Sequence, residues 1–244
     1  SRTLVLDPEY VFGFTLGGEM DFERYPVIAV DSESNIYVSG LTESADFPVT
    51  PGAYSAIIDG SIDAFVTKIS ADGSSIVYSS FLGGNGSERG YDIEVDDDGS
   101  AYVLIGDAGS DFPEIPEGAN SQFTSDIFLV KMSPDGSSLE YSKKVATRSA
   151  EPSDLILIDN EYIGMTGSDR EGTYPVTEGA YDTVFEYKTN CFVSKFTMDA
   201  ELVAATYLSG VSVNGGTIGV DQYNNIFVLR SVSYYDNYEL VRDS

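Results

Sequence analysis

A motif built on an aromatic residue followed by proline occurs three times in this chain. The sequence DFPVTPGAY at 46–54 returns as DFPEIPEGAN at 111–120 and as TYPVTEGAY at 173–181. The aromatic positions, 47, 112 and 174, are 65 and then 62 residues apart. A period of this length indicates one supersecondary unit repeated along the chain, each unit burying its apolar faces against its neighbours. The chain is therefore expected to fold as an array of similar units.

Each unit also carries two short apolar segments joined by a turn that begins with aspartate. In the first unit, VIAVD at 27–31 is followed by IYV at 36–38. Segments rich in Val, Ile and Tyr that are joined by Asp, Asn, Gly and Ser predict β-hairpins. Further copies lie at 93–103, 155–159 and 218–228, and their aspartates are Asp96, Asp159 and Asp221.

A second hairpin follows the aromatic-proline motif in each complete unit. Its first strand reads DAFVTK at 63–68, DIFLVK at 126–131 and NCFVSK at 190–195. Asp72-Gly73 and Asp135-Gly136 then supply the turns, because glycine adopts positive φ without steric cost. Each unit thus holds four short strands, and no segment has helical periodicity. Four-stranded units repeated along a sequence predict the blades of a β-propeller.

We therefore expect an all-β fold, a β-propeller of four-stranded antiparallel blades, in a single domain over residues 1–244. Such a length is ordinary for one all-β domain. The expected repeat units are 19–84, 85–147, 148–210 and 211–244, the last of them completed by 1–18.

The two ends of the chain match different parts of one unit. Residues 6–18 align with 198–210, and residues 237–244 align with the third-strand segment 63–70. We expect the N-terminal strand to complete the last blade and close a ring of four, because closure removes open sheet edges. The alternative is that the chain is a fragment of a propeller of six to eight blades.

Three segments of the first unit resemble the SBBP family of β-propeller repeats. They are IAVDSESNIYVSG at 28–40, DFPVTPGAY at 46–54 and DAFVTKISADGSSIVYSSFLGG at 63–84. The likeness extends over roughly residues 12–230 and weakens in the third and fourth units. The resemblance implies a propeller in a secreted or cell-surface protein of bacteria or archaea. It implies no catalytic residues, so none is carried over.

The chain is strongly acidic, with 40 acidic and 13 basic residues and a net charge of −27. Such a surface repels phosphate backbones and anionic lipid, which argues against nucleic-acid partners and membrane insertion. Because 42% of the residues are hydrophobic, the acidity does not indicate a disordered chain. A protein or glycan at the cell surface, flanking domains and self-assembly all remain open as partners.

Histidine is absent, which excludes catalytic triads, histidine metal sites and histidine general bases. Cys191 is the only cysteine, so no intrachain disulfide forms, and we expect it to be a small buried apolar residue. We expect a non-catalytic module for binding or structural scaffolding. One alternative is a secreted polysaccharide-active enzyme that uses carboxylates. Another is an architectural subunit of a surface layer or filament.

The acidic turn DDDGS at 96–100 resembles the start of a calcium loop, with oxygen ligands at alternate residues. It lacks the glutamate that closes such loops. Aspartate and asparagine also satisfy hairpin turns with their own side chains, and we expect this turn function. Calcium remains the alternative, and its candidate ligands are Asp31, Asp96, Asp98 and Asp221.

The fourth unit lacks the aromatic-proline insertion. Asp221 and Asn237 are 16 residues apart, whereas Asp31 and Asp63 are 32 apart. This shortening is typical of repeat degeneration near a terminus. The alternative is an exposed ligand-binding notch at the missing loop, lined by Tyr234, Tyr235, Asp236 and Tyr238.

One basic position recurs in all four units. The residues are Lys68, Lys131, Lys195 and Arg242, four of only 13 basic residues in the chain. We expect each to form an ion pair with an acidic group on its own or a neighbouring blade. The alternative is a basic ring that captures an anion.

Overall fold

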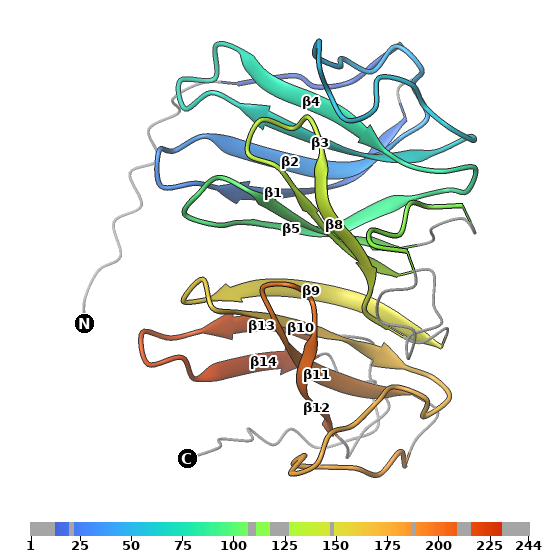
Figure 1. Ribbon diagram of the computed structural model, residues 1–244, viewed down its shortest axis with the longest axis vertical. Helices are drawn as coiled ribbons and strands as arrows, with labels where there is room; N and C mark the ends of the chain where they lie inside the picture. The colour runs from blue at the N-terminus through green and yellow to red at the C-terminus, as the bar shows by residue number, and fades with distance from the viewer. Residues whose placement is uncertain are drawn as a thin grey trace, which may run out of the picture.

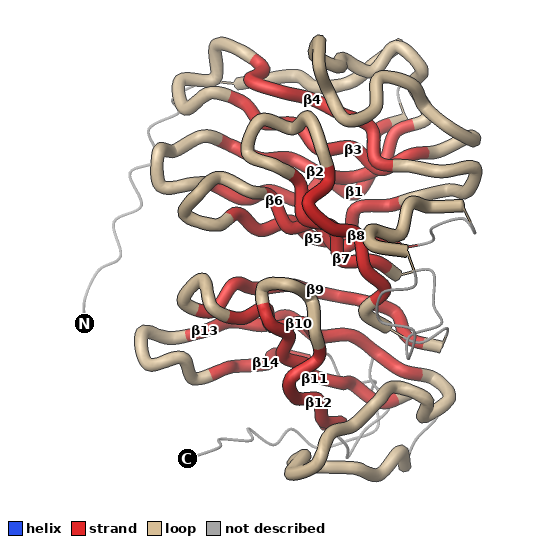
Figure 2. The backbone as a smooth tube through the Cα atoms, viewed as in Figure 1, coloured by secondary structure: helices blue, strands red, loops and turns tan. Residues whose placement is uncertain are grey.

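The computed structural model describes residues 13–19, 22–106, 111–117, 127–146, 149–186, 189–208 and 216–230. Over these residues the chain consists of strands, turns and loops without a helix (Figure 2). Accordingly, the described part contains no helix long and apolar enough to cross a membrane. The all-β prediction is confirmed.

The strands form three four-stranded sheets and one hairpin, which we call blades 1 to 4 (Figure 1). Blade 1 contains β1 (Glu23–Val30), β2 (Ile36–Thr42), β3 (Asp63–Ile69) and β4 (Ile76–Leu82). Blade 2 contains β5 (Arg89–Val95), β6 (Ala101–Gly106), β7 (Phe128–Met132) and β8 (Leu139–Lys144). Blade 3 contains β9 (Ala150–Ile158), β10 (Tyr162–Asp169), β11 (Asn190–Thr197) and β12 (Leu202–Leu208). Blade 4 contains β13 (Gly216–Val220) and β14 (Ile226–Arg230).

In the three four-stranded blades, neighbours in sequence are neighbours in the sheet, and all pairs are antiparallel. The first strands of successive blades lie side by side, since β1 contacts β5, β5 contacts β9, and β9 contacts β13. A register shift interrupts the pairing of the third and fourth strands just after Lys68, Lys131 and Lys195. The repeat in sequence is therefore a repeat in backbone geometry.

Strand β6 shows how each blade serves two interfaces. Ala101, Val103 and Ile105 belong to the apolar core shared with blade 1, whereas Tyr102 and Leu104 belong to the core shared with blade 3. All five side chains are fully buried. Because successive side chains of a strand point to opposite faces, one strand contributes to two different cores. Stacked blades thus replace the solvent on both faces of blade 2.

The aromatic residue of each aromatic-proline motif packs on its own blade. The ring centroids of Phe47 and Phe65 are 4.5 Å apart, and those of Phe112 and Phe128 are 4.8 Å apart. Tyr174 stacks on Phe192 with the centroids 3.7 Å apart. The motif therefore anchors its loop on the blade that carries it.

The same loops cover the free edge of the fourth strand in each complete blade. The Thr50 amide donates to the Ser79 carbonyl, and the Thr177 amide donates to the Ala205 carbonyl, both at 3.1 Å. In blade 2, the Ile115 amide donates to the Ser142 carbonyl at 2.8 Å. An uncovered edge would present unpaired amides to other chains. The insertion therefore closes each blade laterally with residues of that blade.

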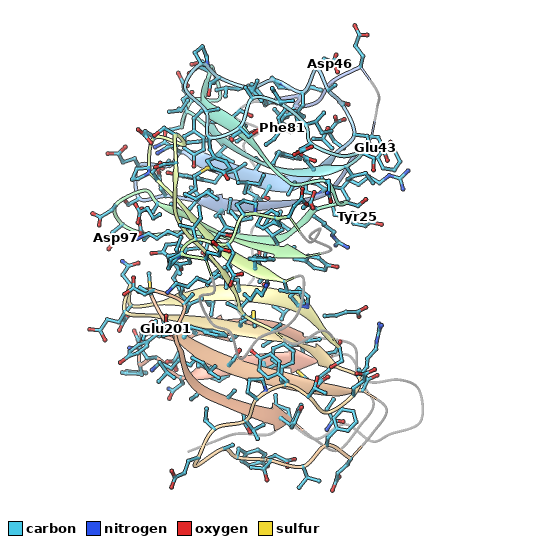
Figure 3. The ribbon with its side chains drawn as sticks, turned by 45° about the vertical axis from the view of Figure 1, so that its right-hand side comes forward. Tyr25, Glu43, Asp46, Phe81, Asp97 and Glu201 are labelled. Atoms are coloured by element: carbon cyan, nitrogen blue, oxygen red, sulfur yellow. The ribbon has the colours of Figure 1, made fainter. Side chains whose placement is uncertain are left out.

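The connection between blades is also repeated. The amide of Asn85 donates to both carboxylate oxygens of Asp111, at 2.9 and 3.1 Å, and the amide of Glu19 donates to both oxygens of Asp46 at 3.1 Å. Figure 3 shows Asp46 at the end of blade 1. A Cβ atom on Gly84 would lie 2.8 Å from the Asp111 carboxylate, so any other residue there would displace that carboxylate. Residues 17–19 therefore contact the loop of blade 1 in the same way as residues 83–85 contact the loop of blade 2.

The predicted closure of a four-bladed ring is not seen among the described strands. Strands β13 and β1 do not pack on each other as β1 and β5 do. Side chains at both ends of the array remain exposed, including Ile28 on β1 and Leu229 on β14. Residues 13–18 of the N-terminal segment predicted to close the ring form no strand, and the rest of that segment and residues 231–244 lie outside the described residues.

Candidate functional site

The turns of the four first hairpins lie along one edge of the molecule, at the left in Figure 2. In the first turn, the Asp31 Oδ1 atom accepts hydrogen bonds from the amides of Glu33 and Asn35, at 3.0 and 2.8 Å. Its Oδ2 atom accepts hydrogen bonds from the side-chain Nδ2 of Asn35 at 2.8 Å and from the Tyr37 hydroxyl at 3.2 Å. The Asp31 carboxylate thus holds the turn and the strand that follows it.

The second and fourth turns use their aspartates in the same way. Asp96 accepts hydrogen bonds from the backbone amides of Asp98 and Ser100 and from the Tyr102 hydroxyl. Asp221 accepts hydrogen bonds from the backbone amides of Tyr223 and Asn225 and from the Asn225 side chain. Asp31, Asp96 and Asp221 therefore all perform the turn function expected from the sequence.

The recurring lysines lie beside these aspartates. Lys68 Nζ is 3.3 Å from Asp31, and Lys131 Nζ is 3.7 Å from Asp96 and 3.0 Å from Glu140. The predicted ion pairs are confirmed in blades 1 and 2. Lys195 differs, because its ammonium lies 3.5 Å from the centroid of the Tyr162 ring. The fourth member, Arg242, lies outside the described residues.

In the first turn, hydrogen bonds and the charge of Lys68 lower the pKa of Asp31. Burial alone would raise the pKa of Asp31, but hydrogen bonds from Asn35 and the ammonium of Lys68 outweigh burial and hold that pKa below its usual range. The Asp31 carboxylate therefore stays ionised and paired at neutral pH. Its remaining capacity to bind a cation is reduced by the ammonium already beside it.

Neighbouring turns are joined by hydrogen bonds between blades. The Tyr37 hydroxyl of blade 1 donates to the Gly99 carbonyl of blade 2 at 3.2 Å. The Asn160 side chain of blade 3 donates to Asp97 of blade 2 at 2.6 Å, and Asn224 of blade 4 donates to Asp159 of blade 3. Each junction in the described array thus has a polar contact at this edge.

A small polar cavity of about 110 Å³ lies between the first two turns. Asp97, one of the residues that line the cavity, is labelled in Figure 3. Of the predicted calcium ligands, Asp31 and Asp98 line the cavity, whereas Asp221 is on the turn of blade 4. The described residues contain no group of three or more acidic or cysteine side chains arranged to hold a metal ion. Calcium binding at the turns stays a prediction. The residues that line the cavity are Asp31, Ser32, Glu33, Lys68, Asp97, Asp98 and Gly99.

A second group of carboxylates lies on the first strands of blades 2 and 3. Asp92 accepts a hydrogen bond from the Leu155 amide at 2.8 Å, and Asp154 accepts one from the Ile218 amide at 2.7 Å. Each carboxylate therefore binds the backbone of the next blade. Sequence reasoning did not single out these residues, although acidic residues inside an apolar strand were a usable signal.

Asp92 and Asp154 also interact with each other. Burial, followed by the hydrogen bond with Asp154 and its charge, raises the pKa of Asp92. Burial and the charge of Asp154 raise the pKa of Glu94 to about 7. A neighbouring carboxylate raises the pKa of a carboxyl group because two negative charges close together repel each other. The three side chains form a group that we call the inner carboxylates, able to hold a proton near neutral pH.

Another pair of acidic residues is buried at the junction of blades 1 and 2. Asp63, at the start of β3, is 1% exposed, and Glu88, just before β5, is fully buried. Burial, together with the charges of Glu88 and Asp59, raises the pKa of Asp63 to about 7, although the Asp59 amide donates a hydrogen bond to it. Asn190 occupies the equivalent position in blade 3 and is also buried. This junction is therefore sensitive to protonation.

The remaining sequence-predicted positions are placed as follows. Cys191 is fully buried and has no disulfide, as expected for a small apolar side chain. The predicted ligand-binding residues Tyr234, Tyr235, Asp236 and Tyr238 lie outside the described residues.

A family model described as the SBBP β-propeller repeat matches residues 27–48. No curated protein matches the chain. Three solved structures are similar to this chain at low sequence identity and with TM-scores below 0.5. The GH43 protein BlXynB from Bacillus licheniformis has 11% identity and a TM-score of 0.46, over 88% of this chain and 37% of that one. The phage phi92 endosialidase has 12% identity and a TM-score of 0.44, over 82% of this chain and 29% of that one.

The hydrazine synthase of Kuenenia stuttgartiensis has 13% identity and a TM-score of 0.37, over 83% of this chain and 61% of that one. This chain thus spans less than two thirds of each of these structures. Such distant likeness carries no information about activity. The family match covers the end of β1, the first turn, β2 and the start of the next loop, and it includes the Asp31 network. Residues 27–48 therefore match the SBBP β-propeller repeat, and they lie within an all-β array of antiparallel blades.

Proposed function

We propose that this chain is a non-catalytic β-propeller module that provides a binding or scaffolding surface on a secreted or cell-surface protein. One observation carries the proposal: the recurring charged side chains are used to hold the fold together. Asp31 and Asp96 each bond their own turn and a lysine, and Asp97 bonds the next blade. Side chains that bond to their own turn and to neighbouring groups in this way hold the surface around them rigid.

An ion pair between the outer strand of blade 2 and the β11–β12 turn of blade 3 supports the same proposal. Lys143 of β8 donates hydrogen bonds to the Asp199 carbonyl at 2.7 Å and to the Glu201 carboxylate at 2.8 Å, which joins blades 2 and 3. Lys143 is nearly buried. The polar contacts between blades therefore occur at the turn edge, on the first strands and on the outer strands. A module built this way suits repeated contact with a protein or glycan partner.

A second candidate function is a polysaccharide-active enzyme, and the inner carboxylates favour it. Glu94, with its raised pKa, could hold a proton beside Asp154, as a general acid requires. Glycoside hydrolysis uses two carboxyl groups in different protonation states. In this function Asp92, Glu94 and Asp154 would be the reacting groups.

Hydrolysis assays on neutral and acidic polysaccharides separate the two functions. We expect the wild-type chain to release no reducing ends above the background of the Asp92→Asn/Asp154→Asn double variant. Asp72→Asn, which changes an exposed carboxylate on the β3–β4 turn, is the matched control. Hydrolysis by wild type and the control that is lost in the double variant would overturn the non-catalytic proposal.

The setting and the ligand need separate measurements. We expect protease added to intact cells to degrade the native protein while a cytoplasmic marker survives. We expect the purified chain to bind a surface glycan or protein with unchanged affinity in the Asp92→Asn/Asp154→Asn variant. Protection of the protein in intact cells would contradict the proposed location.

A further inference from the structure

Apolar side chains are exposed at both ends of the array of blades. At one end, Ile28 and Val30 of β1 are 65% and 56% exposed. At the other end, Phe227 and Leu229 of β14 are 58% and 74% exposed. We call the first pair the leading face and the second pair the trailing face. Exposed apolar strands of this kind mark interaction surfaces.

The leading face corresponds to residues that are buried inside the array. Ile28 and Val30 are 65 residues before Ile93 and Val95, which hold the same places in blade 2. Ile93 is only 1% exposed, and both Ile93 and Val95 pack in the core shared with blade 1. The leading face is therefore half of a blade-to-blade interface.

The trailing face corresponds to the other half of the same interface. Phe227 and Leu229 are 125 residues after Tyr102 and Leu104 of β6. Tyr102 and Leu104 are fully buried in the core between blades 2 and 3. Blade 4 thus presents toward the end of the array the side chains that blade 2 presents to blade 3.

The backbone leading into blade 1 supports the same correspondence. The Glu19–Asp46 hydrogen bonds repeat the Asn85–Asp111 hydrogen bonds that link the end of blade 1 to blade 2. The outer part of this side of blade 1 is filled by Phe47 and Phe81, with Leu16 packed against them. The part left open is the first strand, where a preceding blade would place its own first hairpin.

We propose that the trailing face of one copy of this chain packs on the leading face of a second copy, head to tail. The contact continues the interface already formed three times within the chain, between the first strands of successive blades. It joins two different surfaces, so each bound copy leaves one free face and the assembly grows into a ring or a filament. This inference rests on the proposed scaffolding function and names a second copy as its partner.

The test is sedimentation of the whole chain over a wide range of concentration, with one variant for each face. We expect wild type to form dimers and larger species as concentration rises, and Ile28→Lys and Leu229→Lys each to remain monomeric. An equal mixture of the two variants should form dimers and nothing larger, because each variant retains one intact face. Val203→Lys, which charges an exposed apolar residue of β12, should assemble like wild type.

Three outcomes would overturn the inference. A monomeric wild type whose amides at 28–30 and 227–229 resist hydrogen exchange would show that the faces close within one chain. A monomeric wild type with rapid exchange at those amides would show that neither face binds a second copy. Assembly that Ile28→Lys and Leu229→Lys leave intact would place the contact elsewhere. Polysaccharide hydrolysis by the monomeric variants would instead contradict the proposed function and leave this contact standing.

Discussion

Replacing Asp63 by asparagine should stabilise the protein at neutral and alkaline pH. The Asp63 side chain is buried, and its Oδ1 atom has no hydrogen-bond partner among the described residues. Ionisation there places a charge near the buried Glu88 carboxylate, whose charge raises the pKa of Asp63 further. Asparagine removes the charge and keeps an oxygen for the Asp59 amide. The chain already carries buried Asn190 at the equivalent position of blade 3.

The size of the effect follows from the shift of the Asp63 pKa, from 3.8 to about 7. Because the folded-state pKa is the higher one, the stability associated with protonated Asp63 is fully present below pH 3.8. It is lost as the pH rises through about 7. A shift of about three units at about 1.4 kcal/mol each corresponds to a loss of about 4 kcal/mol. Asparagine does not titrate, so the Asp63→Asn variant escapes this loss.

Urea denaturation of wild type and Asp63→Asn at a series of pH values measures the effect. We expect the difference in unfolding free energy to shift in favour of the variant by about 3 kcal/mol between pH 5 and pH 8. Asp72→Asn is the control, since hydrogen bonds from Ser70 and Ser74 lower the pKa of exposed Asp72 to about 2. Its contribution is lost only as the pH falls through that value, so its difference should stay constant above pH 5. A difference for Asp63→Asn that does not change with pH would refute the reasoning.

Three further predictions concern the repeated features. Phe112→Ala should lower the unfolding free energy by about 3 to 5 kcal/mol in urea denaturation, because it leaves a cavity where a buried aromatic ring was. A loss below about 1 kcal/mol would contradict the packing role of Phe112. Lys68→Met should cost about 1 to 3 kcal/mol because it leaves the Asp31 side chain, which is 6% exposed, without its cation. Arg170→Met, which breaks an exposed pair, should cost less than about 1 kcal/mol, and equal losses for the two variants would contradict this. Calcium and magnesium should raise the melting temperature equally after chelator treatment, whereas a larger calcium effect that Asp98→Ala removes would establish a calcium site.

The strands and turns could be predicted because their causes are local and repeated. The alternation of apolar residues defines the strands, and Asp31 and its counterparts close turns with bonds that span only four residues. The aromatic-proline motif was interpretable for a similar reason, since Phe47 and Phe65 lie within one unit. A feature that recurs at a fixed spacing signals its role several times in one sequence.

The contacts between blades could not be predicted in the same way. Asp92 and Asp154 are 62 residues apart and meet only because β5 and β9 stack. The two residues hold equivalent positions in blades 2 and 3, but blades 1 and 4 have Val27 and Thr217 there, so the recurrence is incomplete. The lysine position was predicted as an ion pair, yet Lys195 lies over the Tyr162 ring instead. Asp159 is the counterpart of Asp31 in blade 3. It lies in a turn in which Asp159 and Asn160 both have positive φ, and its carboxylate accepts a hydrogen bond from Asn224 of blade 4.

The covered edges of the complete blades bear on how such a protein can change in length. Each complete blade closes its outer edge with its own loop and contributes one half of an interface on either side. Duplication of one repeat would therefore insert a blade together with both half-interfaces that its neighbours require. Deletion of one repeat would bring together two halves that already fit. The number of blades can then vary between related proteins with few compensating substitutions, while the residues of each junction must change in step across a distance of about one repeat.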